Sequence, residues 1–200
     1  VTEADIAVEN FIKSKINEKY PTHNIVAEES DNPHKNSEFT WYIDPIDGTG
    51  NYSHSDPHFC ISIALVQNDE LTHACLNLVA LNEFFYAQKG EGAYLNGQKI
   101  SVSKIDKLIE SRIQVGISPI PKYIDDSLKV IKYFYKNASR ARDYGFCAGQ
   151  LAYVACGRAE GLFKIAQHPW DIAAGILIIA EAGGRVTDEK GNKYGSCWRN

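Results

Sequence analysis

The sequence predicts a layered mixed α/β (α+β) fold, and two patterns lead to that prediction. Between residues 59 and 95, short strand-like runs follow one another and are separated by Asn-Asp and Asn-Gly turn pairs, as in an antiparallel sheet. After residue 111, strand-like and helix-like runs alternate, which adds further layers of helix and sheet. We expect two halves, 1–110 and 111–200, joined in one compact unit.

The first element is an amphipathic helix over Thr2–Tyr20. Thr2 is a suitable N-cap with Asp5 three positions later, in the spacing of a capping box, and Pro21 ends the helix. Apolar side chains recur at steps of three and four residues and predict one buried stripe, made of Val8, Phe11, Ile12, Ile16 and Tyr20.

Runs of apolar and β-branched residues predict the strands of the first half. These runs are Asn24–Ala27, Phe39–Asp44, Phe59–Val66, Thr72–Val79, Glu83–Gln88 and Gly92–Leu95. The second strand is expected to end at Asp44, because Pro45 has no amide hydrogen and cannot continue the ladder.

In the second half, strand and helix patterns alternate. We expect strands at Arg112–Ile117, Glu160–Ala166 and Arg185–Asp188, and helices at Asp125–Tyr135, Gln150–Cys156 and Trp170–Ala182. Glycines follow the last two helices, as is common at helix C-termini.

Composition excludes several functional classes. The chain has 200 residues with a net charge of -4, which argues against a broad basic surface for nucleic acid. No apolar run approaches the roughly 20 residues that span a bilayer, and the N-terminal residues do not resemble a signal peptide. The five cysteines form no Cys-x-x-Cys pair, so we expect free thiols and a cytoplasmic location.

Acidic residues stand at the ends of several predicted elements. Asp44 and Asp47 flank the turn expected at Pro45, Glu28 follows an earlier strand, and Asp171 begins an apolar helix. Each alone has an ordinary explanation, as a polar turn or as an N-terminal helix charge. Together these oxygen ligands predict a site for hard divalent cations, and they favour magnesium over zinc.

Two segments resemble the signatures of the inositol monophosphatase family. One is the hexapeptide Asp-Pro-Ile-Asp-Gly-Thr at 44–49, and the other begins with Trp-Asp at 170–171 and continues to Gly184. The segments 28–30 and 1–5 resemble further family segments in the right order. The resemblance implies the layered αβαβα sandwich shared with fructose-1,6-bisphosphatase. Against the family layout, the sequence lacks an N-terminal helical stretch and the closing part of the C-terminal half.

The resemblance also implies a mechanism in which two or three Mg²⁺ ions activate water to hydrolyse a phosphate monoester, without a phosphoenzyme. The implied metal ligands are Glu28, Asp44, the Ile46 carbonyl, Asp47 and Asp171. The implied catalytic residues are Glu28, Thr49 and Asp5. The implied substrate-binding residues are Asp47, Gly48, Thr49, Ala148, Lys164 and Asp171.

Substrate recognition departs from the family pattern. The ring-contacting segment reads Gly-Phe-Cys-Ala-Gly at 145–149, and Lys164 stands where relatives often have a glutamate. Lys164 is either a solvated surface lysine or a partner for a second anionic group.

We expect hydrolysis of myo-inositol 1-phosphate or a similar polyol phosphate, suppressed by lithium, in a homodimer that binds neither membranes nor nucleic acid directly. The alternatives are a phosphatase for fructose 1,6-bisphosphate or 3′-phosphoadenosine 5′-phosphate. From another class, some extragenic-suppressor relatives act as regulatory partners of the transcription machinery.

Overall fold

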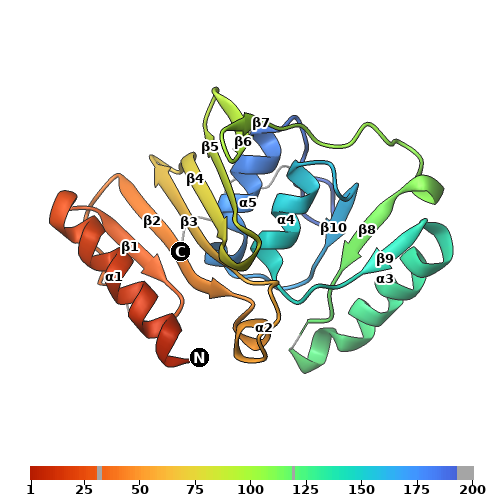
Figure 1. Cartoon of the computed structure of the whole chain (residues 1–200), viewed down its shortest axis with the longest axis horizontal. Coiled ribbons are helices and arrows are strands. Elements are labelled where there is room, and N and C mark those ends of the chain that lie inside the picture. The colour runs from red at the N-terminus through yellow and green to blue at the C-terminus, as the bar shows by residue number, and fades with distance from the viewer. Residues whose placement is uncertain (31–32, 119, 193–200) are drawn as a thin grey trace.

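A computed structural model describes residues 1–30, 33–118 and 120–192 and shows five layers (Figure 1). From one side to the other they are helix α1, a seven-stranded sheet, the central helices α4 and α5, a three-stranded sheet, and helix α3. This arrangement confirms the predicted αβαβα sandwich. Cys197, expected to be a free thiol, lies outside the described residues.

Helix α1 (Glu3–Lys19) begins and ends close to the predicted positions. The Asp5 carboxylate accepts hydrogen bonds from the Thr2 amide at 2.7 Å and from the Thr2 hydroxyl at 2.5 Å, which completes the predicted capping box. The predicted apolar stripe is partly wrong, because Phe11 is 64% exposed. Asp5 and Glu9 are buried instead, so the inner face of this helix carries two carboxylates toward the sheet.

The larger sheet contains seven strands in sequence order. They are β1 (Asn24–Ala27), β2 (Phe39–Asp47), β3 (Cys60–Gln67), β4 (Glu70–Leu78), β5 (Glu83–Gln88), β6 (Gly92–Leu95) and β7 (Gln98–Lys99). Strand β1 is parallel to β2 and every later pair is antiparallel. Asn68 and Asp69 have positive φ angles of 49° and 63°, as the two-residue turn predicted between β3 and β4 requires.

Strand β2 continues beyond its predicted end. The prediction that the strand stops at Asp44 was wrong, because the chain runs through Pro45 to Asp47. The missing proline donor is accommodated by a register shift: Asp44 pairs with Ser62, whereas Asp47 pairs with Cys60. The short helix α2 (Thr49–Ser53) follows directly. The irregular strand end therefore places Asp44, Asp47 and the start of α2 within six residues.

The main core lies between the two sheets. Helices α4 (Cys147–Ala155) and α5 (Pro169–Glu181) pack against each other, and α5 covers the inner face of β3 and β4. Every residue of α4 is buried. Because an apolar helix enclosed by protein shows only a weak amphipathic pattern, sequence reasoning began α4 three residues late, at Gln150.

The smaller sheet contains three parallel strands in the order β10 (Gly161–Phe163), β8 (Arg112–Val115) and β9 (Arg140–Arg142), and α3 (Ile124–Asn137) packs beside them. Strand β9 was not predicted, because its Arg-Ala-Arg sequence resembles a solvated edge. The strand predicted at 185–188 was wrong, since only an isolated bridge forms there. Short 3₁₀ helices occur at Val79–Leu81, Leu108–Glu110 and Pro121–Tyr123.

None of the helices among the described residues combines the length and the apolar character needed to cross a bilayer.

Candidate functional site

Four carboxylates come together from three separated parts of the chain. Glu28 directly follows β1, Asp44 and Asp47 lie in β2, and Asp171 lies in the first turn of α5. Strands β1 and β2 are hydrogen-bonded neighbours, which brings Glu28 beside Asp44. The Ser62 hydroxyl of β3 donates to the Trp170 carbonyl at 3.2 Å and ties the start of α5 to the same sheet.

The carboxylates repel one another strongly enough to hold protons. Burial, together with the charges of Asp47, Glu28 and Asp171, raises the pKa of Asp44 well above its usual value. Desolvation raises the pKa of Glu28 to about 7 although its outer side is exposed, and a hydrogen bond with Asp44 opposes that rise. Burial and the neighbouring negative charges therefore favour the protonated forms of these two carboxyl groups over their ionised forms.

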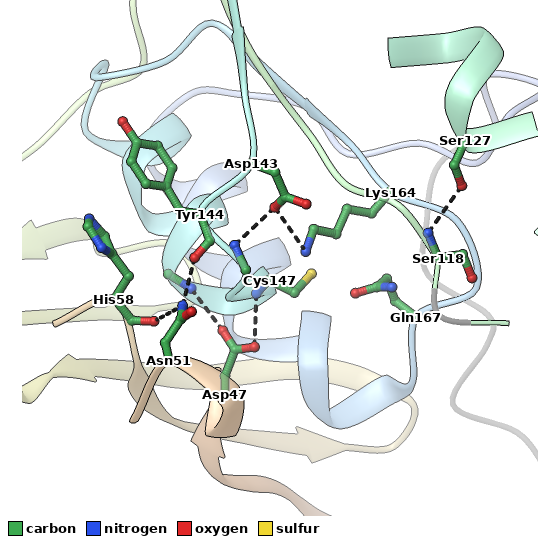
Figure 2. Close-up of polar contacts among 12 residues, drawn as sticks. Asp47, Asn51, His58, Ser118, Ser127, Asp143, Tyr144, Cys147, Lys164 and Gln167 are labelled. Carbon is green, nitrogen blue, oxygen red and sulfur yellow. Dashed lines mark hydrogen bonds and ion pairs between the residues drawn. The ribbon is translucent and has the colours of Figure 1, made fainter. Parts of the chain in front are cut away.

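Asp47 joins the two halves of the molecule by capping helix α4. Its carboxylate accepts hydrogen bonds from the amides of Cys147 at 2.8 Å, Ala148 at 2.6 Å and Gly149 at 3.3 Å (Figure 2). These amides lie in the first turn of α4, where backbone donors have no partner within the helix. Burial raises the pKa of Asp47 to about 6, and the amide hydrogen bonds limit the rise.

Thr49 connects this acidic group to helix α1. Its hydroxyl lies 3.1 Å from the Asp5 Oδ1 atom and 3.0 Å from the Ile46 carbonyl oxygen. Asp5 is fully buried, so one carboxylate caps α1 and also contacts Thr49. Gly48, between Asp47 and Thr49, has a φ angle of +90°. Residues with a side chain rarely adopt this φ angle, so the turn that positions Asp47 and Thr49 depends on glycine.

Two positioning residues escaped sequence reasoning. The Asn51 amide donates to the His58 carbonyl at 2.6 Å and to the Tyr144 carbonyl at 2.7 Å, holding the loop after β2 against the approach to α4 (Figure 2). Glu9 is 2% exposed and accepts the Glu29 amide at 2.9 Å, fixing the segment that carries Glu28. The spacing of Glu9 four residues after Asp5, on one helix face, was the available signal.

The remaining predicted residues fall into two groups. The Ala148 amide donates a hydrogen bond to the Asp47 carboxylate. The positive charge of Lys164 lowers the pKa of Asp47 and so opposes the effect of burial. Arg140 and Arg142 are exposed on β9, at the edge of the smaller sheet. The assignment of Ala148 and Lys164 to a substrate site stays a prediction.

The carboxylate oxygens are suitable ligands for hard divalent cations, although they are not already arranged around one metal position. Among the described residues, no three His, Cys, Asp or Glu side chains converge closely enough to form a preformed metal site. Like charges with no cation between them oppose a closer approach of these side chains. Within residues 1–30, 33–118 and 120–192, the buried Asp44 Oδ1 atom has no hydrogen-bond partner, an arrangement that is costly for a carboxylate unless a cation contacts it.

Comparison with known proteins agrees with this geometry. A five-layered fold with carboxylates gathered at the end of β2 defines a class of phosphatases that is generally metal-dependent. A family model described as the inositol monophosphatase family matches residues 1–199, so the chain belongs to that family.

Individual relatives match over most of the chain. An inositol monophosphatase of Dictyostelium discoideum is 45% identical over 199 residues, covering 96% of this chain and 73% of that protein. A fructose-1,6-bisphosphatase/inositol-1-monophosphatase of Thermotoga maritima is 39% identical, covering 100% of this chain and 75% of that protein. The solved structure of extragenic suppressor protein suhB from Bartonella henselae superimposes with a TM-score of 0.93 at 33% identity, covering 96% and 74% of the two chains.

The raised pKa values of these carboxyl groups predict how stability depends on pH. The pKa values of Glu28 and Asp47 are raised to about 7 and about 6 in the folded state, so protonation stabilises the fold at low pH. That stabilisation is complete below the unfolded-state values near 4 and is lost as the pH rises through 6 and 7. In EDTA, we expect the thermal midpoint to fall between pH 5 and pH 8.

The effect of added Mg²⁺ on the thermal midpoint tests the same pH dependence a second way. A cation that binds the ionised carboxylates stabilises the folded state, so the midpoint should rise more at pH 8 than at pH 5. A calorimetric scan in both buffers measures this difference. Equal shifts at the two pH values would contradict the account.

Proposed function

We propose that the protein is a Mg²⁺-dependent phosphate monoester hydrolase that acts on myo-inositol 1-phosphate or a similar polyol or sugar phosphate. One observation carries the proposal. Asp44 is one of four neighbouring carboxylates and has a buried oxygen without a hydrogen-bond partner in the described part of the chain, four residues before Gly48. Burying several carboxylates close together costs folding free energy unless they bind cations.

In this proposal Glu28, Asp44, Asp47, Asp171 and the Ile46 carbonyl hold two or three Mg²⁺ ions. Bound Mg²⁺ supplies Lewis-acid chemistry that polarises the phosphoryl oxygens and makes a nearby water more acidic. The backbone amides of Gly48 and Thr49 donate to the phosphate, at the point where the chain leaves β2. Ala148 and Asp171 face the polyol from the C-terminal half.

The chain's own groups orient and deprotonate the attacking water. The Thr49 hydroxyl donates to Asp5, and this direction leaves its oxygen lone pairs to accept a hydrogen bond from water, so that the water proton can move to Thr49 as the hydroxyl proton moves to Asp5. Asp5 is fully buried and held by the Thr2 amide, so it fixes the orientation of the Thr49 hydroxyl. Glu28, at the end of β1 beside Asp44, would help to hold that water.

Phosphate release from a panel of esters tests this proposal. With Mg²⁺ the protein should hydrolyse myo-inositol 1-phosphate or a related polyol phosphate, and EDTA should abolish the reaction. Thr49→Val should lower kcat by about a hundredfold because it removes the hydroxyl, whereas Thr49→Ser should keep most of the activity. Absence of phosphate release from every ester on the panel would refute the proposal.

A second candidate reaction is hydrolysis of a sugar bisphosphate. The printed name of the Thermotoga relative includes fructose-1,6-bisphosphatase, and the cationic Lys164 beside Asp47 favours an anionic substrate. A regulatory role with the transcription machinery is the alternative from another class, suggested by the extragenic suppressor protein of similar structure. We also propose that the protein is cytoplasmic and forms a homodimer, and that each subunit consists of the halves 1–110 and 111–200. Equilibrium sedimentation can test the homodimer.

A further inference from the structure

Helix α3 forms the outer layer beside the smaller sheet and carries a row of apolar side chains that stays largely open (Figure 1). Ile124, Leu128 and Tyr135 are 38%, 46% and 66% exposed. Ile131 stands in the same row and is partly buried, because it packs against the core of the smaller sheet. We call this row, made of Ile124, Leu128, Ile131 and Tyr135, the α3 seam.

The spacing of the α3 seam is that of a coiled coil. Its residues follow one another at steps of four, three and four, which correspond to d, a, d and a positions of a heptad. The face that α3 turns toward the sheet lies beside this row: Ser127 is 1% exposed, and Phe134 packs against the core of the smaller sheet. The sheet therefore covers only part of the apolar surface of α3, and the seam suits a second helix.

Opposite charges border the seam on the side away from the sheet. Asp125 and Lys132 each follow a d position, so both stand at e positions, and both are exposed. Side chains at e positions flank the contact between two helices and set their orientation. When two copies of α3 run antiparallel, Asp125 of each copy lies near Lys132 of the other. In a parallel pair the e positions face the g positions, Ser127 and Phe134, which carry no charge.

We propose that two copies of this chain associate through antiparallel packing of their α3 seams. The partner is a second copy because one helix supplies both the apolar row and the two signs of charge that complement it. This surface serves the homodimer proposed above and does not depend on the proposed reaction. The 14 residues of α3 span about 21 Å, so the contact is smaller than a standard interface of roughly 1,600 Å². We therefore expect a dissociation constant in the micromolar range.

Leu128→Glu tests the apolar part of the contact. A carboxylate in the middle of the seam should raise the dissociation constant at least about tenfold, as measured by equilibrium sedimentation. Leu128 is almost half exposed, so the monomer should stay folded. Tyr133→Glu is the matched control, since Tyr133 is 54% exposed on the opposite side of α3, and it should leave the constant unchanged.

Reversal of the two charges tests the antiparallel orientation. Asp125→Lys alone brings two lysines together, and Lys132→Asp alone brings two aspartates together, so each should weaken the homodimer by about tenfold at low ionic strength. A mixture of the two variants pairs unlike charges at both positions and should restore the native constant. Asp126→Lys makes the same charge change at an f position, away from the seam, and should have no effect.

These measurements separate the α3 seam from dimerisation elsewhere on the protein. A dimer that survives Leu128→Glu unchanged overturns the seam and leaves the homodimer standing. A mixture of the charge variants that associates no more tightly than either variant alone overturns the antiparallel pairing. A native protein that stays a monomer at about 100 μM overturns the seam and the homodimer together. Phosphate release is not measured, so failure of the proposed reaction does not affect this test.

Discussion

Asp44→Asn should reduce Mg²⁺-dependent phosphate release by at least about a thousandfold. Asp44 interacts with the charges of Glu28, Asp47 and Asp171, and its buried Oδ1 atom, which has no hydrogen-bond partner among the described residues, would serve as a cation ligand. Loss of that charge removes Lewis-acid stabilisation of several kcal/mol, and each 1.36 kcal/mol corresponds to a factor of ten in rate. Initial rates at saturating Mg²⁺ measure the loss.

The same change should not destabilise the metal-free protein. The amide side chain has nearly the shape of the carboxylate, and it removes a buried charge that repels Asp47, Glu28 and Asp171. In EDTA at pH 8 the thermal midpoint of Asp44→Asn should therefore equal or exceed that of the native protein. Asp126→Asn, an exposed change on α3, serves as the control for both measurements. An active Asp44→Asn variant would contradict the proposed role.

Gly48→Ala should destabilise the fold by about 2–4 kcal/mol and abolish activity. At φ +90° a Cβ atom would lie 2.8 Å from the His58 carbonyl oxygen and 2.9 Å from the Phe146 Cβ atom. Neither contact is with the end of a flexible side chain, so backbone must move. Because Asp47 and Thr49 flank Gly48, that movement displaces a carboxylate and a hydroxyl of the site together. Chemical denaturation and phosphate release measure the two effects.

Gly50→Ala provides the matched control two residues later. Gly50 lies in helix α2, and no heavy atom lies within 4 Å of the position its Cβ would take. Alanine favours helical backbone, so this change should be neutral or slightly stabilising. Equal losses of stability in the two variants would show that the turn at Gly48 tolerates a side chain, against the geometry described above.

The sequence predicted the parts of this fold whose signals are local. The capping box of Thr2 and Asp5 fixed the start of α1, and the Asn-Asp turn pair fixed the β3–β4 hairpin. The acidic group could also be predicted, because carboxylates at the ends of apolar strands have few ordinary explanations when several occur together. The two signature segments then ordered those residues into one site.

Features that depend on distant partners could not be predicted. Pro45 remains inside β2 because the ladder shifts its register between Asp44 and Asp47, which depends on β3. The start of α4 is set by the Asp47 carboxylate, about 100 residues earlier in the chain, so the helix pattern alone placed it late. Asn51 likewise acts through carbonyl groups of His58 and Tyr144. Such contacts form only when segments that are separated in the sequence have packed together.

Anomalous diffraction from a crystal soaked in Mn²⁺ tests most directly whether the carboxylates hold cations. Mn²⁺ accepts the same hard oxygen ligands as Mg²⁺, and its anomalous signal identifies the ion. The account predicts at least two peaks, both bordering the Asp44 carboxylate and shared with Glu28, Asp47 or Asp171. A map in which Mn²⁺ avoids Asp44, or binds only at the molecular surface, would contradict it.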